Sequence, residues 1–371
     1  MNHYCTYFDR GFLIQGLALW RSLVAHEPTA TLWVLALDDC TAEALRAVGG
    51  GRLRVVPLAK LETEDPELLA AKANRSRVEY YFTLSPCWPR WLLRSQPDIQ
   101  RVTYVDADMF FLARPTEIFA AMAAARASVL VTEHRFPTWL AHYERHGRFN
   151  VGILSFARDA AGWDCLEDWR GQCLAWCHDR LENEKYADQK YLDAWPGKVG
   201  VKLLVLEQPG VNLAPWNWDG RRYEWAPDQT LSVDGKPVVL VHFARFHPLL
   251  GSWWWRSGQL DYGVMPWRLR QSLYGRYWQA LKQARSELST WRTDIDFSRR
   301  PIRLDRDFWR MLPLRLAFGG DWLRVGGTFL NLRFGFGRWS GQFLAKLRTI
   351  FLRTKRSTES ASQPQHRQAA K

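Results

Sequence analysis

The chain has 371 residues, of which 47% are hydrophobic, so it is long enough for one large domain with an appendage or for two domains. Its formal net charge of +13 is unevenly spread: residues 301–371 hold 14 lysines and arginines against 4 acidic residues, whereas residues 1–300 are nearly balanced. This distribution argues against a main domain that binds nucleic acid. It indicates a basic C-terminal region that meets an anionic partner.

The sequence shows no signal for secretion or membrane insertion. No stretch reaches the roughly 18 uncharged apolar residues that a membrane span needs, and the first residues lack the basic and apolar regions of a signal peptide. The six cysteines form no CxxC pair, which suits a reducing compartment. We therefore expect a cytoplasmic protein.

Strand and helix patterns alternate along the first 250 residues. Short apolar runs rich in β-branched and aromatic residues predict strands at residues 3–8, 31–38, 53–56, 102–105, 128–132, 150–156 and 238–243. Helical spacing of apolar residues lies between them, at residues 13–24, from 41, at 78–93, at 115–126 and at 163–181. This order of elements predicts an α/β fold with a mostly parallel sheet.

The amino-acid composition changes after about residue 250. Residues 251–356 interleave tryptophan, phenylalanine and leucine with arginine and glycine, which predicts a basic, aromatic-rich helical appendage. From Leu304 to Arg356 the apolar faces are edged by cations, so this part either lies in the headgroup layer of an anionic membrane or packs on protein. Residues 357–371 are polar, and we expect them to be a disordered tail.

Two carboxylates, Asp106 and Asp108, stand in the stretch RVTYVDADMFFLARP. They follow a strand-like apolar run and precede a second one, which places them at a strand end, where open α/β sheets bind ligands. Hard oxygen ligands at this spacing suit Mn²⁺ or Mg²⁺. The same triplet also occurs as a helix cap or a solvated turn, but the apolar residues on both sides favour the metal site.

Several motifs in order resemble the retaining nucleotide-sugar glycosyltransferases of the GT-A fold, particularly the family 8 type. The resemblance covers residues 1–247 and rests on six segments: CTYFDRGFLIQGLALWRSL, YYFTLSP, VTYVDADMFF, RFNVGILSF, YADQKYLDAWP and VHF. It implies a GT-A-like (Rossmann-like) catalytic domain over residues 1–250 and activity on a nucleoside diphosphate sugar, with uridine as the expected base.

The resemblance also assigns roles to individual residues. Asp106, Asp108 and His242 resemble the ligands of Mn²⁺ (or Mg²⁺), and Asp106 also resembles the contact to the donor ribose. Asp188 and Gln189 resemble the segment beside the anomeric carbon. The remaining donor contacts that it implies are Thr6, Arg77, Glu133 and Asn150.

The sequence departs from the family pattern in two places. The family has a Gly, Lys and Trp pattern after the histidine, whereas this chain offers Arg245 and His247 as phosphate donors. The family also has an arginine directly after the paired aromatics, whereas this chain reads Tyr-Tyr-Phe-Thr, so Arg77 one helical turn earlier is the candidate for the diphosphate.

These features predict a metal-dependent glycosyltransferase that moves a sugar to an acceptor hydroxyl, with a glycan or lipid-linked acceptor. Retention by same-face attack fits the lack of an evident general base, and inversion with Asp188 as the base stays open. Two other functions are alternatives. A haloacid-dehalogenase-like phosphatase would use Asp106 as nucleophile, and an inactive sugar-binding protein would use the 21 tryptophans as stacking platforms.

A second metal site, for zinc, is the alternative to core packing for Cys173, Cys177 and His178. We expect core packing, because Cys173 and Cys177 share one helical stripe with the apolar residues Leu166, Trp169 and Leu181.

Overall fold

The computed structural model describes residues 1–228, 230–244, 246–250, 253–255, 262–263, 265–293 and 322–324. The chain divides into two compact units, Met1–Ala244 with Pro266–Arg300, and Arg245–Met265 with Pro301–Lys371. Helix α10 (Trp267–Trp291) belongs to the first unit because it packs on α1 and α2, although composition groups it with the appendage. The membrane-interfacial segment expected from Leu304 to Arg356 and the tail at 357–371 lie outside the described residues, apart from 322–324.

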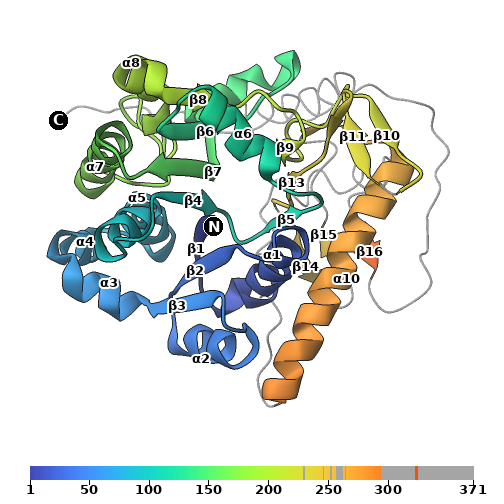
Figure 1. The fold of residues 1–371 in the computed structure, drawn as a ribbon, viewed down its shortest axis with the longest axis horizontal. Helices are drawn as coiled ribbons and strands as arrows, with labels where there is room; N and C mark the ends of the chain where they lie inside the picture. Colours follow the sequence, from blue (N-terminus) through green and yellow to red (C-terminus); the bar gives the residue numbers. More distant parts are fainter. Residues whose placement is uncertain are drawn as a thin grey trace, which may run out of the picture. The chain divides into compact units, whose positions relative to one another are not determined.

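The first unit is built on a seven-stranded sheet in the order β3-β2-β1-β4-β7-β6-β8 (Figure 1). In that order, the strands span Leu53–Pro57, Thr31–Ala36, His3–Phe8, Arg101–Val105, Phe149–Ala157, Val129–Glu133 and Leu203–Val205. Strands β3, β2, β1 and β4 pair in parallel, as do β6 and β8, whereas β7 runs antiparallel to both of its neighbours. The predicted α/β class with a mostly parallel sheet is therefore confirmed.

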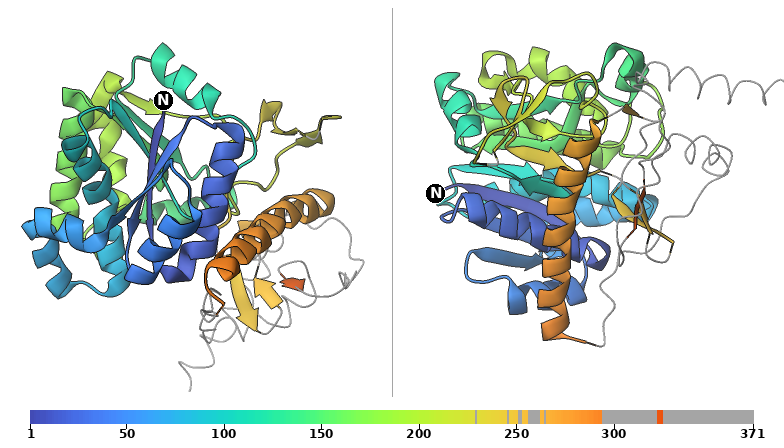
Figure 2. Two further views of the ribbon diagram at one scale, coloured as in Figure 1. Left: turned by 60° about the horizontal axis from the view of Figure 1, so that its bottom comes forward. Right: turned by 90° about the vertical axis from the view of Figure 1, so that its right-hand side faces the viewer.

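Helices cover both faces of this sheet. Helix α1 (Leu13–His26) packs on α10, whereas α5 (Arg77–Ser95) packs on β4 and on α7 (Ala160–Ala175), which lies against β7 (Figure 2). The core between the sheet and α5 and α7 buries Trp88, Trp169 and Trp195. The other helices are α2 (Asp39–Val48), α3 (Leu58–Glu64), α4 (Pro66–Ala71), α6 (Thr116–Ala124) and α8 (Trp195–Val199). Short 3₁₀ segments span Arg10–Phe12, Lys72–Asn74, Thr138–His146, Lys190–Ala194 and Gly200–Lys202.

Local sequence explains where the helices begin. The Asp38 carboxylate caps α2 by accepting a hydrogen bond from the backbone N–H of Thr41 at 2.7 Å. Ser76 and Glu79 form a capping box at the start of α5. Although α5 contains Pro86 and Pro89, which lack an N–H to donate, it stays helical with both prolines buried. The buried face of the helix packs on β4 and α7.

The helix α7 is shorter than predicted. It ends at Ala175, so the expected continuation to residue 181 is wrong. Trp176 has extended backbone angles, and Leu181 is 46% exposed, so Leu181 is not part of the buried stripe. The cysteines behave as expected, since Cys173 and Cys177 are both buried as free thiols.

Smaller sheets complete the described structure. Strand β13 (Leu240–His242) lies between β5 (Met109–Phe111) and β9 (Val211–Leu213), antiparallel to β5 and parallel to β9. A hairpin sheet joins β10 (Tyr223–Trp225), β11 (Leu231–Val233) and β12 (Lys236–Pro237). In the second unit, β14 (His247–Leu250), β15 (Trp253–Trp255) and β16 (Trp322–Arg324) pair antiparallel.

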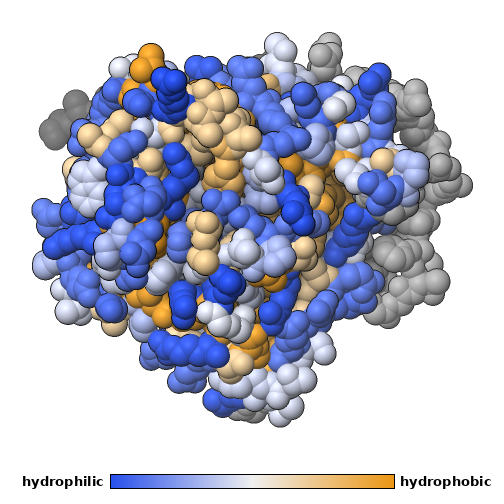
Figure 3. Space-filling model, viewed as in Figure 1, coloured by the Kyte–Doolittle hydropathy of each residue, from blue (hydrophilic) through white to orange (hydrophobic). Residues whose placement is uncertain are grey.

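The surface in the view of Figure 3 is mostly polar, with small apolar patches between charged side chains. Exposed large apolar side chains include Leu69, Val78 and Val201. Within the described residues, no helix has the length and apolar character to span a membrane.

Candidate functional site

The two acids lie where the sequence places them, between β4 and β5. The backbone N–H of Met109 donates to the Asp106 carbonyl at 3.1 Å and closes a tight turn, and the Asp106 N–H donates to the carbonyl of Gly152 on β7 at 3.0 Å. Two strands therefore fix the backbone that carries the carboxylates. This turn lies at the carboxyl end of β4, which runs parallel to β1.

His242 reaches the same place from a distant part of the sequence. Strand β13 pairs antiparallel with β5 in a register that sets His242 opposite Met109, and the Phe243 N–H donates to the Asp108 carbonyl at 3.0 Å. The His242 Nε2 lies 3.1 Å from Asp108 Oδ1 and 3.6 Å from Asp106 Oδ2. One ligand atom from each of the three residues lies within 4.8 Å of the others.

The charges in this group fit a divalent cation. Burial raises the pKa of Asp106, and the neighbouring Asp108 raises it further, while His242 opposes both. Burial lowers the pKa of His242, but the two carboxylates outweigh it and raise that pKa overall. The raised pKa of His242 reflects the negative charge of the two carboxylates beside it. Two carboxylates and one imidazole are also a ligand set that Mn²⁺ accepts.

The other ring nitrogen of His242, Nδ1, faces away from the two carboxylates. Nδ1 is buried and has no hydrogen-bond partner among the described residues. It faces Gly152, since a Cβ at position 152 would lie 3.0 Å from it. Nε2 is therefore the nitrogen that faces the carboxylates and would bind a metal ion.

Asp188, the residue that the resemblance places beside the anomeric carbon with Gln189, is buried and feels the charge of Asp106. Asp188 is only 5% exposed, and its carbonyl accepts a hydrogen bond from Trp169 Nε1 at 2.8 Å. Burial raises the pKa of Asp188 to about 7, with a further contribution from the charge of Asp106. Asp188 is thus a buried acid near Asp106, and not an exposed residue at the start of a helix.

Asn150 is held in one orientation by the backbone. Its Oδ1 accepts hydrogen bonds from the Gly152 N–H at 3.0 Å and from Asn212 Nδ2 at 2.9 Å. The Nδ2 group therefore points the other way, toward Gln189 Oε1 at 3.3 Å and His134 Nε2 at 3.3 Å. Gln189 is fixed in turn, because its Nε2 donates to the His146 carbonyl at 3.1 Å.

The same hydrogen bonds define the state of His134. Because Asn150 donates to Nε2, the ring proton is on Nδ1, which lies 3.2 Å from the Arg148 carbonyl. Burial lowers the pKa of His134 to about 4, which keeps the imidazole neutral near pH 7. His134 also stacks on Phe136 with ring centroids 4.7 Å apart.

Asn212, which the sequence did not single out, supports Asn150 from behind. It is fully buried with a left-handed φ of 56°, and its Nδ2 also donates to Thr132 Oγ1 at 2.9 Å. Arg135 Nη2 donates to the Asn212 carbonyl at 3.1 Å, and Asn217 Nδ2 donates to the same carbonyl at 3.1 Å. Such a strained residue persists because its surroundings over-determine it.

The other three predicted donor contacts, Thr6, Arg77 and Glu133, differ in burial and in their partners. Thr6 is fully buried inside β1, and its Oγ1 has no hydrogen-bond partner in the described structure. Arg77 is an exposed first residue of α5, where a cation opposes the helix dipole. It lies near Tyr81, whose hydroxyl donates to Asp9 Oδ2 at 3.0 Å. Glu133 ends β6, and its Oε1 accepts from Arg148 Nε at 2.8 Å.

Two further expectations concern side chains away from the acids. The side chains of Arg245 and His247, proposed as phosphate donors, lie outside the described residues. His178 faces Glu79, with Nδ1 3.0 Å from Oε1, and it does not join Cys173 and Cys177 in a metal group. Within the described residues, Asp106, Asp108 and His242 are the group suited to a metal ion.

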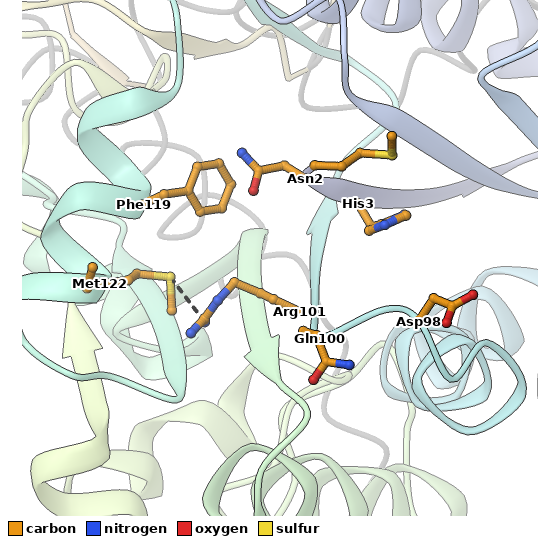
Figure 4. A pocket seen from close by; sticks show the side chains of 9 residues that line it. Asn2, His3, Asp98, Gln100, Arg101, Phe119 and Met122 are labelled. Carbon is orange, nitrogen blue, oxygen red and sulfur yellow. Dashed lines mark hydrogen bonds between the residues drawn. The ribbon is translucent and has the colours of Figure 1, made fainter.

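A cavity of about 500 Å³ lies at the opposite end of the sheet. It opens beside the first residues of β1 and β4, where Arg101 reaches Met122 of α6 and Asn2 lies opposite Phe119 (Figure 4). Arg101 is already bonded there, since Nη2 donates to the Ala127 carbonyl at 3.0 Å. The cavity is therefore separate from the acids, which lie at the carboxyl end of β4.

Tyr7, Ser85 and Tyr104 were not among the residues predicted from the sequence. Tyr104 donates a hydrogen bond from its hydroxyl to Asp106 Oδ1 at 2.7 Å, and the Tyr7 hydroxyl lies 2.9 Å from Ser85 Oγ. All three residues belong to segments that resemble family motifs. Their position within those segments was the signal from which they could have been predicted as site residues.

Two curated proteins of Bacillus subtilis (strain 168) are similar to this chain in sequence, whereas no family model matches it. The uncharacterized protein YfnF is 32% identical over 248 residues, which are 66% of this chain and 81% of YfnF. The uncharacterized protein YfnD is also 32% identical over 248 residues, which are 66% of this chain and 78% of YfnD.

Solved structures with a similar fold are glycosyltransferases. The galactosyltransferase LgtC, in complex with donor and acceptor sugar analogs, has 15% identity and a TM-score of 0.46, covering 76% of this chain and 95% of LgtC. The glycosyltransferase GlyE of Streptococcus pneumoniae TIGR4 has 13% identity and a TM-score of 0.43, covering 79% of this chain and 63% of GlyE. Both are likenesses at the level of fold.

Proposed function

The chain belongs to the same family as YfnF and YfnD of Bacillus subtilis, and we propose that it is a metal-dependent glycosyltransferase. The observation that carries this proposal is the convergence of Asp106, Asp108 and His242, whose ligand atoms lie within 4.8 Å of one another. The two acids come from the turn between β4 and β5, and the histidine comes from a strand about 130 residues later. Their order matches the motifs that resemble family 8 glycosyltransferases.

In this proposal the donor is a nucleoside diphosphate sugar, with uridine as the base. Asp106, Asp108 and His242 hold Mn²⁺ or Mg²⁺, which supplies positive charge for the departing diphosphate. The fixed amides of Asn150 and Gln189 orient the sugar ring, since each has one polar atom anchored by the protein. Arg77 is the proposed cation for the diphosphate, because it is exposed near the end of β1 and no ion pair in the described structure occupies it.

The proposed transfer has two possible stereochemical courses. We propose retention, with the acceptor hydroxyl attacking from the face that the diphosphate leaves and passing its proton to the leaving group. Inversion is the alternative, in which Asp188, a buried acid with a pKa of about 7, would serve as the general base. The anomeric configuration of the first product, read by NMR, separates these two courses.

The partners in this proposal are the nucleotide-sugar donor and a glycan or lipid-linked acceptor. The location that we propose is the cytoplasm, on the inner face of a membrane, with the basic segment from Leu304 to Arg356 in contact with anionic lipid. Co-sedimentation with anionic and neutral vesicles tests this location. The full chain should pellet only with anionic vesicles at low salt, and a chain ending near residue 300 should not.

A screen of nucleotide sugars tests the function. The purified protein is heated with each nucleoside diphosphate, each nucleotide sugar, and Mn²⁺ or EDTA, and the melting temperature is recorded. We expect a rise that needs both Mn²⁺ and a nucleotide with the right base, followed by slow hydrolysis of the matching sugar donor. A phosphatase would instead release phosphate from simple phosphomonoesters, and an inactive sugar-binding protein would bind sugar without turnover.

A further inference from the structure

The imidazole of His242 lacks the support that a metal-binding histidine usually has. Such a histidine almost always donates the N–H of its second ring nitrogen to a carboxylate or a carbonyl, and this bond fixes the direction of the ring. The Nδ1 atom of His242 is buried and has no hydrogen-bond partner among the described residues. Within the described structure, the plane of this ring therefore depends on the groups that pack against it.

The indole of Trp216 packs against this imidazole. The two ring centroids lie 5.2 Å apart with an interplanar angle of 81°, which is an edge-to-face contact. Both side chains are buried, with His242 6% exposed and Trp216 9% exposed. Because a buried contact of this kind leaves little free space, a tilt of the imidazole would bring its atoms into the indole. The contact thus restricts the plane of the His242 ring.

Asp108 and Trp216 act on the same ring in different ways. Asp108 Oδ1 lies 3.1 Å from His242 Nε2 and so selects the edge of the ring that faces the acids. A contact with the indole cannot distinguish the two edges, but it holds the ring plane. At the Nδ1 edge the backbone of β7 is close, since a Cβ atom at position 152 would lie 3.0 Å from that nitrogen. Asp108 thus sets the direction of the imidazole, and Trp216 limits its tilt.

The position of Trp216 is itself fixed by the residue that follows it. Asn217 is 2% exposed, and its Oδ1 accepts the backbone N–H of Ala214 at 3.0 Å, which closes the turn that carries Trp216. The Asn217 Nδ2 group donates to the carbonyl of His134 at 3.0 Å. This turn follows β9, which pairs with β13, and β13 ends at His242. Neighbouring strands therefore carry the indole and the imidazole.

We propose that Trp216 is a positioning residue for the metal ligand His242. Its indole holds the plane of the imidazole so that Nε2 stays directed at Asp106 and Asp108. This is the role that a hydrogen bond to the second ring nitrogen has in most histidine metal sites. The inference rests on the metal site of the proposed function, and it adds a residue that acts on that site through packing.

Trp216 also contacts a second imidazole, that of His134. Their ring centroids lie 5.4 Å apart with an interplanar angle of 63°. His134 has further supports, because it stacks on Phe136 with centroids 4.7 Å apart and its Nδ1 lies 3.2 Å from the Arg148 carbonyl. Loss of the indole should therefore affect His242 more than His134. The affinity for the metal ion is accordingly the quantity to measure.

The test measures Mn²⁺ affinity by the loss of the electron paramagnetic resonance signal of free Mn²⁺. Trp216→Met fills much of the space with a flexible side chain that has no ring, and we expect it to weaken Mn²⁺ binding about tenfold. Trp216→Phe keeps an aromatic ring and should restore binding to within about threefold of the unaltered chain.

Trp218→Met is the matched control for the loss of a buried indole. Trp218 lies two residues further along the chain, is 2% exposed, and packs on Tyr274 of α10 with ring centroids 6.3 Å apart. We expect Trp218→Met to bind Mn²⁺ like the unaltered chain. Circular dichroism spectra and melting temperatures show whether each variant has folded.

A spectroscopic signature separates a tilted ligand from a weakened fold. Modulation of the electron spin echo by ¹⁴N shows whether an imidazole nitrogen is bound to Mn²⁺. At saturating Mn²⁺ we expect this modulation in the unaltered chain, in Trp216→Phe and in Trp218→Met, and a weaker modulation in Trp216→Met. A substitution that only destabilises the fold would leave the modulation of the bound ion unchanged.

A second measurement does not depend on whether Trp216→Met folds. The chain is labelled with 5-fluorotryptophan, and the ¹⁹F signals of Trp216 and Trp163 are identified by their loss in the two phenylalanine variants. Trp163 is the distant reference, because α7 begins beside the end of β7 that pairs with Arg101, whereas the acids lie at the other end of β4. Since paramagnetic broadening falls steeply with distance, Mn²⁺ should broaden the Trp216 signal before that of Trp163.

The outcomes separate the inference from the proposed function. Unchanged Mn²⁺ affinity in Trp216→Met, or an equal loss in Trp218→Met, overturns the inference and leaves the metal site intact. A Trp216 signal that broadens no earlier than that of Trp163 shows that Mn²⁺ binds elsewhere and overturns both, as does a lack of Mn²⁺ binding by the unaltered chain. Mn²⁺ binding that Trp216→Met weakens and Trp216→Phe restores, in a protein that accepts no nucleotide sugar, supports the inference and overturns the proposed function.

Discussion

Gly152 lies directly behind His242: a Cβ atom at position 152 would lie 3.0 Å from His242 Nδ1 and 2.4 Å from Asn150 Oδ1. The Gly152 carbonyl also accepts the backbone N–H of Asp106 at 3.0 Å. Gly152 thus contacts the imidazole of His242, the amide of Asn150 and the backbone of the turn that carries Asp106 and Asp108. Its lack of a side chain is what allows the three to approach so closely.

Gly152→Ala should therefore disturb the site from within the sheet. The added methyl group needs His242 or Asn150 to move, so we expect Mn²⁺ affinity to fall by about tenfold or more and the unfolding free energy to fall by about 1–3 kcal/mol. Titration calorimetry and urea unfolding measure the two effects. Gly171→Ala in α7 is the control, because a Cβ there meets no atom within 4 Å. It should leave the metal affinity unchanged.

Asp108→Ala should abolish transfer without unfolding the chain. It removes one carboxylate that faces His242 Nε2 at 3.1 Å and no core volume. We expect the melting temperature in EDTA to stay within a few degrees of the parent protein, and nucleotide binding to become insensitive to Mn²⁺. Asp168→Ala, at an exposed position of α7, controls for the loss of one charge. Turnover of donor by Asp108→Ala at the parent rate would refute the metal assignment.

Asn212→Ala should act on the sugar and not on the nucleotide. Without Asn212 Nδ2, the Asn150 amide loses one of the two hydrogen bonds that fix its Oδ1. We expect affinity for the sugar donor to fall about tenfold while affinity for the free nucleoside diphosphate with Mn²⁺ is unchanged. Competition binding with the two ligands measures the split. An equal loss for both would show that Asn212 only maintains the fold.

Asp188→Asn should stabilise the protein at high pH. The folded pKa of about 7 exceeds the ordinary 3.8, so between these values the folded state holds a proton that the unfolded state has released. The unfolding free energy of the parent therefore falls as pH rises through this window. Asparagine does not titrate, so we expect Asp188→Asn to exceed the parent by about 1–3 kcal/mol at pH 8 in EDTA. The difference should shrink toward pH 4, and a constant difference would contradict the assignment.

Arg170→Met should destabilise the core beneath α7. Arg170 is buried, and its Nε lies 3.1 Å from Asp65 Oδ2, so methionine leaves the Asp65 carboxylate buried without its main partner. We expect a loss of about 3–5 kcal/mol in unfolding free energy. Adding Asp65→Asn should recover much of this loss, because asparagine is neutral and still caps α4 as Asp65 does. Failure of the second substitution to help would point to lost packing rather than to a stranded charge.

Local patterns predicted the fold class and the place of Asp106 and Asp108 at a strand end. The strand at residues 3–8 and the acids at the end of β4 follow from short-range alternation and from the rule that ligands bind at strand ends. His242 required the family resemblance, because nothing within three residues of it marks a ligand. The register of β13 on β5 is what brings it to Asp108.

The residues whose roles could not be predicted from the sequence act through tertiary contacts. Asn212 supports Asn150 only because a left-handed turn aims its amide at β7, and no local pattern near Asn212 specifies that partner. The end of α7 was missed for a similar reason, since residues 176–181 keep apolar spacing while the chain turns away at Trp176.

The pairing of β13 with β5 makes the metal group a late event in chain synthesis. A ribosome-bound chain that has completed β7 displays both acids but lacks the imidazole, which arrives only with β13. A cation held by Asp108 and His242 would then close a loop of more than about 130 residues. Such a closure acts mainly by reducing the conformational entropy of the unfolded chain. Metal supply during translation would thus influence how quickly the β5-β13-β9 sheet locks onto the rest of the nascent domain.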